Sequence, residues 1–211
     1  MKVAAAWSEE HELADGTHVR VRMIRPEDRE GLRTEFRRLS PESRYRRFFA
    51  HMSDLSDEML RYLTEVDGVD HVAIIATVES PDLKTERGVG VARFVRTARE
   101  RHVAEAAVTV VDDMQRKGVG RLLGLKLVEA ALERGVTRFR GEVLTSNVDV
   151  LDALGAAGAS LTDTGVGTVA FEVPIGPLDH EPVLRRLFRE IAASVVLLLR
   201  EMRPPPPRGE G

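Results

Sequence analysis

Apolar and polar residues follow two different periods along this chain of 211 residues. Residues 19–23 alternate between apolar side chains and arginines, and this period of two predicts a half-buried strand. Pro26 suits the first turn of a helix, and apolar residues recur at helical spacing from there to Leu39. A second start signal at residues 40–42 opens an aromatic segment, and a third helix begins near Ser56.

The period of two returns in the middle of the chain. Residues 71–78, 89–95 and 103–111 are rich in Val, Ile and Ala and predict three strands, the first two joined by a polar hairpin loop at 81–88. The rest of this region predicts helices at 118–133 and 147–156, with strands at 138–144, 160–164 and 168–173. This order predicts an α/β (α+β) fold: a mixed, mostly antiparallel sheet of six to seven strands with helices on both faces.

The pattern divides the chain into three parts. Residues 1–15 form a poorly patterned N-terminal arm, residues 16–175 the compact domain, and residues 176–211 an appendage. In the appendage, residues 181–202 carry apolar side chains at spacings of three and four, which predicts one amphipathic helix before the proline-rich tail at 204–207. We expect this helix to pack on its own domain, with a homodimer through it as the alternative.

Composition excludes several classes of protein. There is no cysteine, which excludes a disulfide framework, a thiolate metal site and a thiol nucleophile, and is typical of the reducing cytoplasm. The six histidines lack ligand spacing, so no metal is expected. The longest apolar run, at residues 191–199, is too short for a membrane span. A net charge of −3 argues against a nucleic-acid partner.

Basic residues are nevertheless concentrated in one stretch. Between Arg20 and Arg47 there are ten arginines against five acidic residues. Such a stretch is usually a solvated helix face, and an anion-binding patch is the alternative.

A turn rich in glycine and basic residues carries the clearest chemical signal. Residues 115–121 read Gln-Arg-Lys-Gly-Val-Gly-Arg and lie between a predicted strand and a predicted helix. The first backbone N–H groups of a helix have no partner within it, and they bind phosphate at the positive end of the helix dipole. Gly118 and Gly120 allow close approach of the backbone, and the basic side chains add positive charge. Asp112 and Asp113, just before the turn, are expected to terminate the strand.

This turn resembles the pyrophosphate loop of the GNAT acyltransferases. Residues 115–120 follow that family's Q/R-x-x-G-x-G/A pattern. A second segment is similar to the family's N-x-x-A-x-x-x-Y-x-x-x-G-F pattern through Asn147, Val150, Leu154 and Gly158. The resemblance covers about residues 16–175, and it implies the GNAT fold.

Two further segments resemble the bacterial Pat-type protein lysine acetyltransferases. These are residues 39–49, from Leu-Ser-Pro-Glu to Phe-Phe, and residues 104–108, Ala-Glu-Ala-Ala-Val. Pat-type catalytic domains are often fused to a regulatory region, for which this chain has no room, so we expect a stand-alone catalytic domain. The chain departs from the GNAT pattern at Leu154, where many members carry a tyrosine acid, and at Ala159, where an aromatic residue is usual.

The resemblance implies an N-acetyltransferase that uses acetyl-CoA as co-substrate, needs no metal and transfers the acetyl group to an amine, most readily a protein lysine. Glu105 is the candidate general base. The alternative is that Glu105 is an ordinary acidic residue of the strand. Because the chain has no cysteine, the amine attacks directly. The alternatives are a small-molecule amine acetyltransferase and a catalytically degenerate acyl-CoA-binding sensor or partner module. The residues expected to bind the cofactor are Val108, Thr109 and Val110 along its arm, Gln115, Arg116, Lys117, Gly118, Val119, Gly120 and Arg121 around its pyrophosphate, and Asn147.

Overall fold

One sheet of eight strands forms the centre of the molecule. The computed structural model describes residues 7–41, 53–79 and 85–176. The strands lie in the order β1-β2-β3-β4-β5-β6-β8-β7, and all neighbours are antiparallel except β5 and β6. Their bounds are β1 Ser8–Glu12, β2 His18–Met23, β3 His71–Glu79, β4 Glu86–Arg96, β5 Val103–Val110, β6 Arg138–Leu144, β7 Ser160–Asp163 and β8 Thr168–Pro174.

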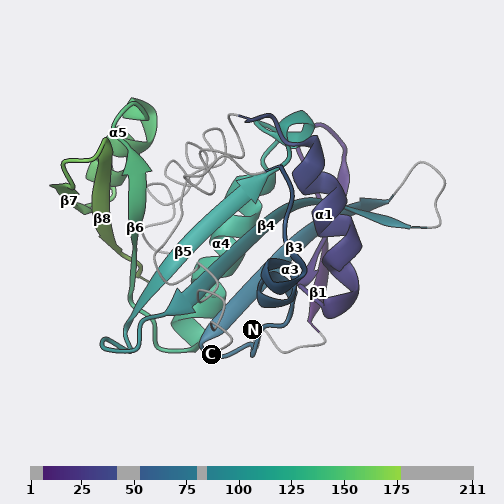
Figure 1. Ribbon diagram of the computed structural model, residues 1–211, viewed down its shortest axis with the longest axis horizontal. Helices are drawn as coiled ribbons and strands as arrows, with labels where there is room; N and C mark the ends of the chain where they lie inside the picture. Colours follow the sequence, from purple (N-terminus) through teal and green to yellow (C-terminus); the bar gives the residue numbers. More distant parts are fainter. Residues whose placement is uncertain (1–6, 42–52, 80–84, 177–211) are drawn as a thin grey trace, which may run out of the picture.

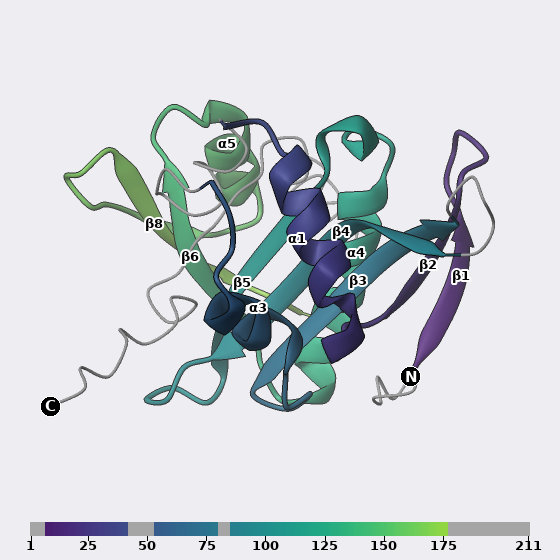
Figure 2. The same ribbon diagram turned by 45° about the vertical axis from the view of Figure 1, so that its right-hand side comes forward.

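Helices cover both faces of the sheet. Helix α4 packs against β3, β4 and β5 on one face, whereas α1 and α3 lie on the other (Figures 1 and 2). The side chains of Phe94, Leu123 and Leu127 are fully buried between α4 and the sheet. The helices are α1 Arg29–Arg38, α3 Asp57–Thr64, α4 Val119–Glu133 and α5 Val148–Ala156, with short 3₁₀ turns η1 Pro26–Asp28 and η2 Asp112–Met114.

The structure confirms the predicted α/β class and the mixed, mostly antiparallel sheet, with one more strand than expected. The additional strand is β1, which lies inside the segment expected to be an unpatterned arm. Its sequence, Ser-Glu-Glu-His-Glu, has no apolar period because it is an exposed edge strand. It is held by pairing with β2 and by the Glu9 carboxylate, which accepts from Trp7 Nε1 at 3.0 Å and pairs with Lys126 Nζ at 2.9 Å.

Several predictions fall on segments that the structure does not describe. The aromatic segment after residue 41, part of the hairpin loop at 81–88, the amphipathic helix at 181–202 and the proline-rich tail all lie outside the described residues. The division into arm, domain and appendage, and the homodimer through the last helix, therefore stay predictions.

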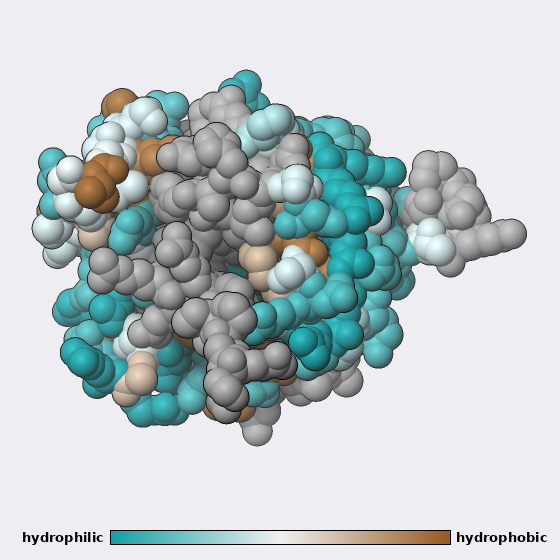
Figure 3. Space-filling view, in the orientation of Figure 1, coloured by the Kyte–Doolittle hydropathy of each residue, from teal (hydrophilic) through white to brown (hydrophobic). Residues whose placement is uncertain are grey.

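The described surface is mostly polar on the face shown in Figure 3. Apolar side chains gather near α5 and β7, where Val148, Leu161 and Val166 are exposed. Scattered exposed apolar residues are ordinary in folded proteins, so we assign no interface to them. In the described ranges, none of the helices has the length and apolar character needed to cross a bilayer.

Most described arginines of the basic stretch between Arg20 and Arg47 form ion pairs. The described arginines at positions 20, 22, 29, 33, 37 and 38 each pair with at least one carboxylate, from Glu10, Asp28, Glu30, Glu35, Asp54, Asp57, Glu65 or Glu86. Neutralised guanidinium groups attract an external anion weakly. Arg25 is exposed and its side chain has no ion pair among the described residues. For the six paired arginines, the solvated-face interpretation therefore holds over the anion-binding patch.

Close packing at Gly90, between β4 and α4, yields a stability prediction. A Cβ atom at Gly90 would lie 2.8 Å from Leu123 Cδ1 and 3.0 Å from Thr109 O, too close for either atom to stay in place. We expect Gly90→Ala to lower the free energy of unfolding by about 1–3 kcal/mol in urea titrations followed by circular dichroism. The control is Gly155→Ala in α5, where a Cβ atom meets nothing within 4 Å, and helix propensity favours alanine by about 1 kcal/mol. Equal stability of the two variants would contradict the packing described.

Candidate active site

The two parallel strands at the centre of the sheet separate along their length. Strands β5 and β6 pair at Val103, Ala104 and Glu105 only, opposite Arg138, Phe139 and Arg140. Beyond this point, within the described residues, β5 pairs only with β4 and β6 only with β8. Figure 1 shows the two ribbons diverging toward their C-terminal ends. One edge of β5, from Ala106 to Val110, is thus left without a strand partner among the described residues.

Alternation along β5 decides which backbone groups face this open edge. The N–H of Val111 donates to Val89 O at 3.0 Å and the carbonyl of Val103 accepts from Thr97 N at 3.0 Å, so odd-numbered residues bond toward β4. Even-numbered residues then turn their N–H and C=O groups the other way. Val108 and Val110 therefore face the open edge, as a pantetheine-binding edge requires. The backbone of Thr109 belongs to the β4 ladder, so it has no group to offer at that edge.

Glu105 lies at the closed end of the divergence. It is the last residue of β5 that pairs with β6, and its side chain is only 8% exposed. Glu105 lies opposite Val95 of β4. Val95 points to the same face of the sheet as Val91 and Arg93, the alternate residues of β4 that line a cavity under α1. Alternate residues of a strand share a face of the sheet, and so do residues opposite each other on paired strands. Glu105 is thus buried on the face that α1 and α3 cover.

The loop after β5 prepares the N-terminus of α4 for an anion. Gly118 takes φ +99° at the N-cap position, which favours glycine, and no side chain caps the helix. The first bond after the cap runs from Leu122 N to Gly118 O at 3.0 Å, so the N–H groups of Val119, Gly120 and Arg121 have no partner within the helix. No acidic residue lies in this first turn. Of these three residues, Val119 and Gly120 are buried.

Other side chains of the predicted set have defined places. Gln115 donates from Nε2 to Val110 O at 3.3 Å and to Asp112 Oδ1 at 3.1 Å, which closes the turn onto the end of β5. Asn147 occupies the N-cap position of α5, yet its side chain makes no capping bond. It therefore remains available to a ligand, as the cofactor role requires.

Parallel strands bring these residues to one end of the site. The loop at 115–121 follows β5 and Asn147 follows β6, and the C-terminal ends of parallel strands lie at the same edge of a sheet. By the pairing of the strands, Glu105 lies at the closed end of the divergence, the unpaired edge of β5 lies along one side, and the loop at 115–121 and Asn147 follow the diverging ends of β5 and β6. Figure 1 shows the separation of the two strands. Among the described residues no cluster of three acidic or histidine side chains is placed to hold a metal ion, and independence from metal stays a prediction.

Arg87 is a structural link that the sequence did not predict. Its guanidinium donates to both carboxylate oxygens of Asp113, at 2.8 and 2.9 Å, and to Glu35 of α1 at 3.0 Å. The bond from Arg87 holds the pKa of Asp113 below its usual value. Asp112 in turn accepts from Ser40 N at 3.0 Å. The two aspartates thus do more than end the strand, because they fasten the turn before the loop to α1.

This architecture defines the class of protein. A sheet that splits between two parallel strands, with an uncapped helix N-terminus at the open end, is the arrangement expected of the GNAT fold. The sequence matches the acetyltransferase (GNAT) family over residues 29–156, and the chain belongs to this family.

One curated relative and two solved structures show which proteins this chain is similar to. The chain is 33% identical over 165 residues to the acetyltransferase Pat of Mycolicibacterium smegmatis, covering 76% of this chain but only 47% of that relative. The GNAT domain of S. lividans PAT superposes with a TM-score of 0.70 at 31% identity, over 81% of this chain and 98% of that one. The Salmonella typhimurium protein yncA, solved with its cofactor acetyl-CoA, shares the fold at a TM-score of 0.58 and 15% identity, over 75% and 94% of the two chains.

The bridge at Arg87 predicts a local change in dynamics. We expect Arg87→Ala to raise amide exchange in residues 112–116 by about five-fold, since a well-formed ion pair near the surface contributes about 1 kcal/mol. Hydrogen–deuterium exchange with mass spectrometry measures this. The matched control is Arg138→Ala, which removes a pair with Glu172 between β6 and β8 and leaves residues 112–116 unchanged. Unaltered exchange in Arg87→Ala would show that the bridge does not hold the turn.

Proposed function

We propose that this chain is an acetyl-CoA-dependent N-acetyltransferase that acts on protein lysine. The observation that carries the proposal is the divergence of β5 and β6, which puts a buried carboxylate at one end of a free backbone edge and an anion-binding helix N-terminus at the other. Membership of the GNAT family and the relationship to Pat support this assignment.

The residues present fit acetyl-CoA. The uncapped N-terminus of α4 and the basic residues Arg116, Lys117 and Arg121 suit a pyrophosphate. The N–H and C=O groups of Val108 and the N–H of Val110 hold an extended amide-containing arm as an added strand would, while the Val110 carbonyl already accepts from Gln115 Nε2 at 3.3 Å. Asn147 offers an amide to the same arm. When bound, acetyl-CoA supplies the acetyl group as a thioester.

Glu105 takes the role of general base. Lysine has an ordinary pKa near 10.4, so at neutral pH a proton must leave its amine before the nitrogen attacks. A carboxylate at the closed end accepts that proton directly or through one water molecule. A backbone N–H of the β5 edge stabilises the negative charge that develops on the acyl oxygen. Val108 is two residues nearer Glu105 than Val110, about 7 Å along the strand, so we assign this role to Val108 in preference to Val110.

Leu154 departs from the tyrosine that many family members carry at this position. Its side chain is fully buried in the main core. The position is therefore used for packing, and Leu154 takes no part in protonating the leaving thiolate.

We expect Glu105→Gln to lower kcat on a lysine peptide by about 10²–10⁴-fold, the usual contribution of a general base. The dissociation constant for acetyl-CoA, measured by calorimetry, should stay within two-fold or so, because the amide keeps the size of the carboxylate. Glu172→Gln, on β8, is the matched control with normal turnover. Unchanged turnover in Glu105→Gln would remove this residue from the mechanism.

The acceptor class is tested by comparing a lysine peptide array with a panel of small amines, using acetyl-CoA and mass spectrometry of the products. We expect acetylated peptides. Products from small amines alone would assign the chain as a small-molecule acetyltransferase. Tight binding of coenzyme A without turnover on any acceptor would assign it as an acyl-CoA-binding sensor or partner module.

A further inference from the structure

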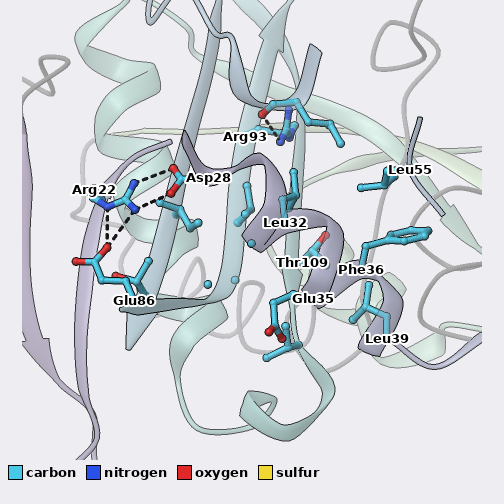
Figure 4. A pocket seen from close by; sticks show the side chains of 18 of the residues that line it. Arg22, Asp28, Leu32, Glu35, Phe36, Leu39, Leu55, Glu86, Arg93 and Thr109 are labelled. Atoms are coloured by element: carbon cyan, nitrogen blue, oxygen red, sulfur yellow. Dashed lines mark hydrogen bonds and ion pairs between the residues drawn. The ribbon is translucent and has the colours of Figure 1, made fainter. Parts of the chain in front are cut away.

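A cavity of about 200 Å³ lies between α1 and the sheet. Its walls come from α1 and from β2 to β5, and they are largely apolar (Figure 4). Leu32 and Phe36 contribute from α1, and Ile75 and Val91 from the sheet, with the threonine side chains of Thr77 and Thr109 between them. One water molecule needs about 15 Å³ of such volume, so the cavity has room for a ligand of roughly ten non-hydrogen atoms.

Arg93 lies at one end of this cavity with most of its hydrogen-bonding capacity unused. Its side chain is 2% exposed. It donates to Leu63 O from Nη2 at 3.1 Å and contacts His71 Nε2 from Nη1 at 3.3 Å, while Nε is buried without a partner. A guanidinium carries five N–H donors, so three of them have no acceptor among the described residues.

No described residue compensates the charge of Arg93. Burial lowers the pKa of Arg93 to about 10, which leaves it charged at neutral pH. Burial also lowers the pKa of His71 to about 4, so the imidazole is neutral there. None of the described carboxylates pairs with Arg93. An isolated buried charge is costly unless an opposite charge meets it.

The other buried or partly buried ionisable groups that line the cavity form ion pairs. Arg22 pairs with Asp28 at 2.7 Å and with Glu86 at 3.1 Å, and Figure 4 shows this cluster apart from Arg93. Glu35 pairs with Arg38 at 2.8 Å and with Arg87 at 3.0 Å. Glu27, which also lines the cavity, has no ion pair among the described residues, but it is exposed, so water solvates its charge. The unmet buried charge on the wall, as far as the structure describes it, is therefore a single cation.

We propose that this cavity binds a small aliphatic carboxylate. The carboxylate pairs with the guanidinium of Arg93, and the hydrocarbon chain lies among the apolar side chains of α1 and the sheet. A bare inorganic anion would leave those apolar walls uncovered, and a neutral hydrocarbon would leave Arg93 uncompensated. Gly31 is exposed and Leu32 partly exposed on the same wall, which places the entrance beside α1.

This site is separate from the proposed acetyl-CoA edge. Thr109 reaches the cavity with its side chain, whereas the groups assigned to the cofactor are the backbone groups of Val108 and Val110 on the other side of β5. The inference therefore goes beyond the proposed function and does not depend on it.

The test is calorimetric titration of the whole chain, without acetyl-CoA, with sodium hexanoate and with hexanamide. We expect hexanoate to bind at least ten-fold more tightly than hexanamide, which has the same chain without the charge. Arg93→Gln should weaken hexanoate binding at least ten-fold, and Arg101→Gln, an exposed arginine that pairs with Asp70, should leave it unchanged. Coenzyme A at saturation should not alter the affinity.

A second variant keeps the test decisive if Arg93→Gln does not fold, as judged by circular dichroism. Val91→Phe fills the cavity and keeps Arg93 in the chain, and it should abolish hexanoate binding. Equal affinity for hexanoate and hexanamide, no binding of either, hexanoate binding that survives Val91→Phe, or competition by coenzyme A would each overturn the proposal.

Discussion

The short parallel pairing of β5 with β6 is the constraint on which the candidate site depends. Backbone N–H and C=O groups inside a protein need partners, and elsewhere in the described sheet neighbouring strands supply them. β5 and β6 each keep an antiparallel neighbour on the outer side, β4 and β8 respectively, so they can part after Glu105 without losing their place in the sheet. Gln115 donates to the Val110 carbonyl, and the groups that remain, the N–H and C=O of Val108 and the N–H of Val110, require a partner that resembles a strand. An extended chain of amides satisfies that requirement, which is why this edge fits a pantetheine arm.

The turn before α4, which leads into the candidate anion-binding helix N-terminus, is held in place by ion pairs on the side that faces α1. Gly118 sets the direction of the chain into α4, and Arg87 joins Asp113 to Glu35 of α1. The helix that closes the cavity and the turn before the pyrophosphate loop are therefore parts of one hydrogen-bonded unit. The same helix carries four arginines of the basic stretch, at positions 29, 33, 37 and 38, and each of them pairs with a carboxylate. Arg93 differs from them because it is buried in the sheet beyond the reach of the described carboxylates, and this contrast marks the cavity as a site for an external anion.

The sequence predicted much of the candidate site because its signals are local. The glycines and basic residues at 115–121 predict a helix start. In the structure Gly118 is the N-cap residue with a positive φ, and the N–H groups that follow it have no partner within the helix. Glu105 and Asn147 were selected by family resemblance, and they lie at the two ends of the divergence. The sequence could not predict that the N–H and C=O groups of Thr109 point toward β4, since this depends on which residues of β4 and β5 face each other. β1 was missed for a similar reason: an exposed edge strand needs no apolar period, and its stability comes from β2 and Lys126.

The sequence by itself determined the class of fold, the order of the central elements and the glycine-containing turn that opens α4, because periodicity, glycine and charge act over a few neighbouring residues. Only the tertiary structure decided where β5 and β6 separate, which backbone groups face the open edge, and that Arg87 joins Asp113 to Glu35 of α1, which precedes Arg87 by 52 positions in the sequence. It also decided that Arg93 is buried without an opposite charge while arginines with the same local pattern are paired. These properties depend on strand register and on the distances between segments remote in sequence, and no local pattern of residues encodes either.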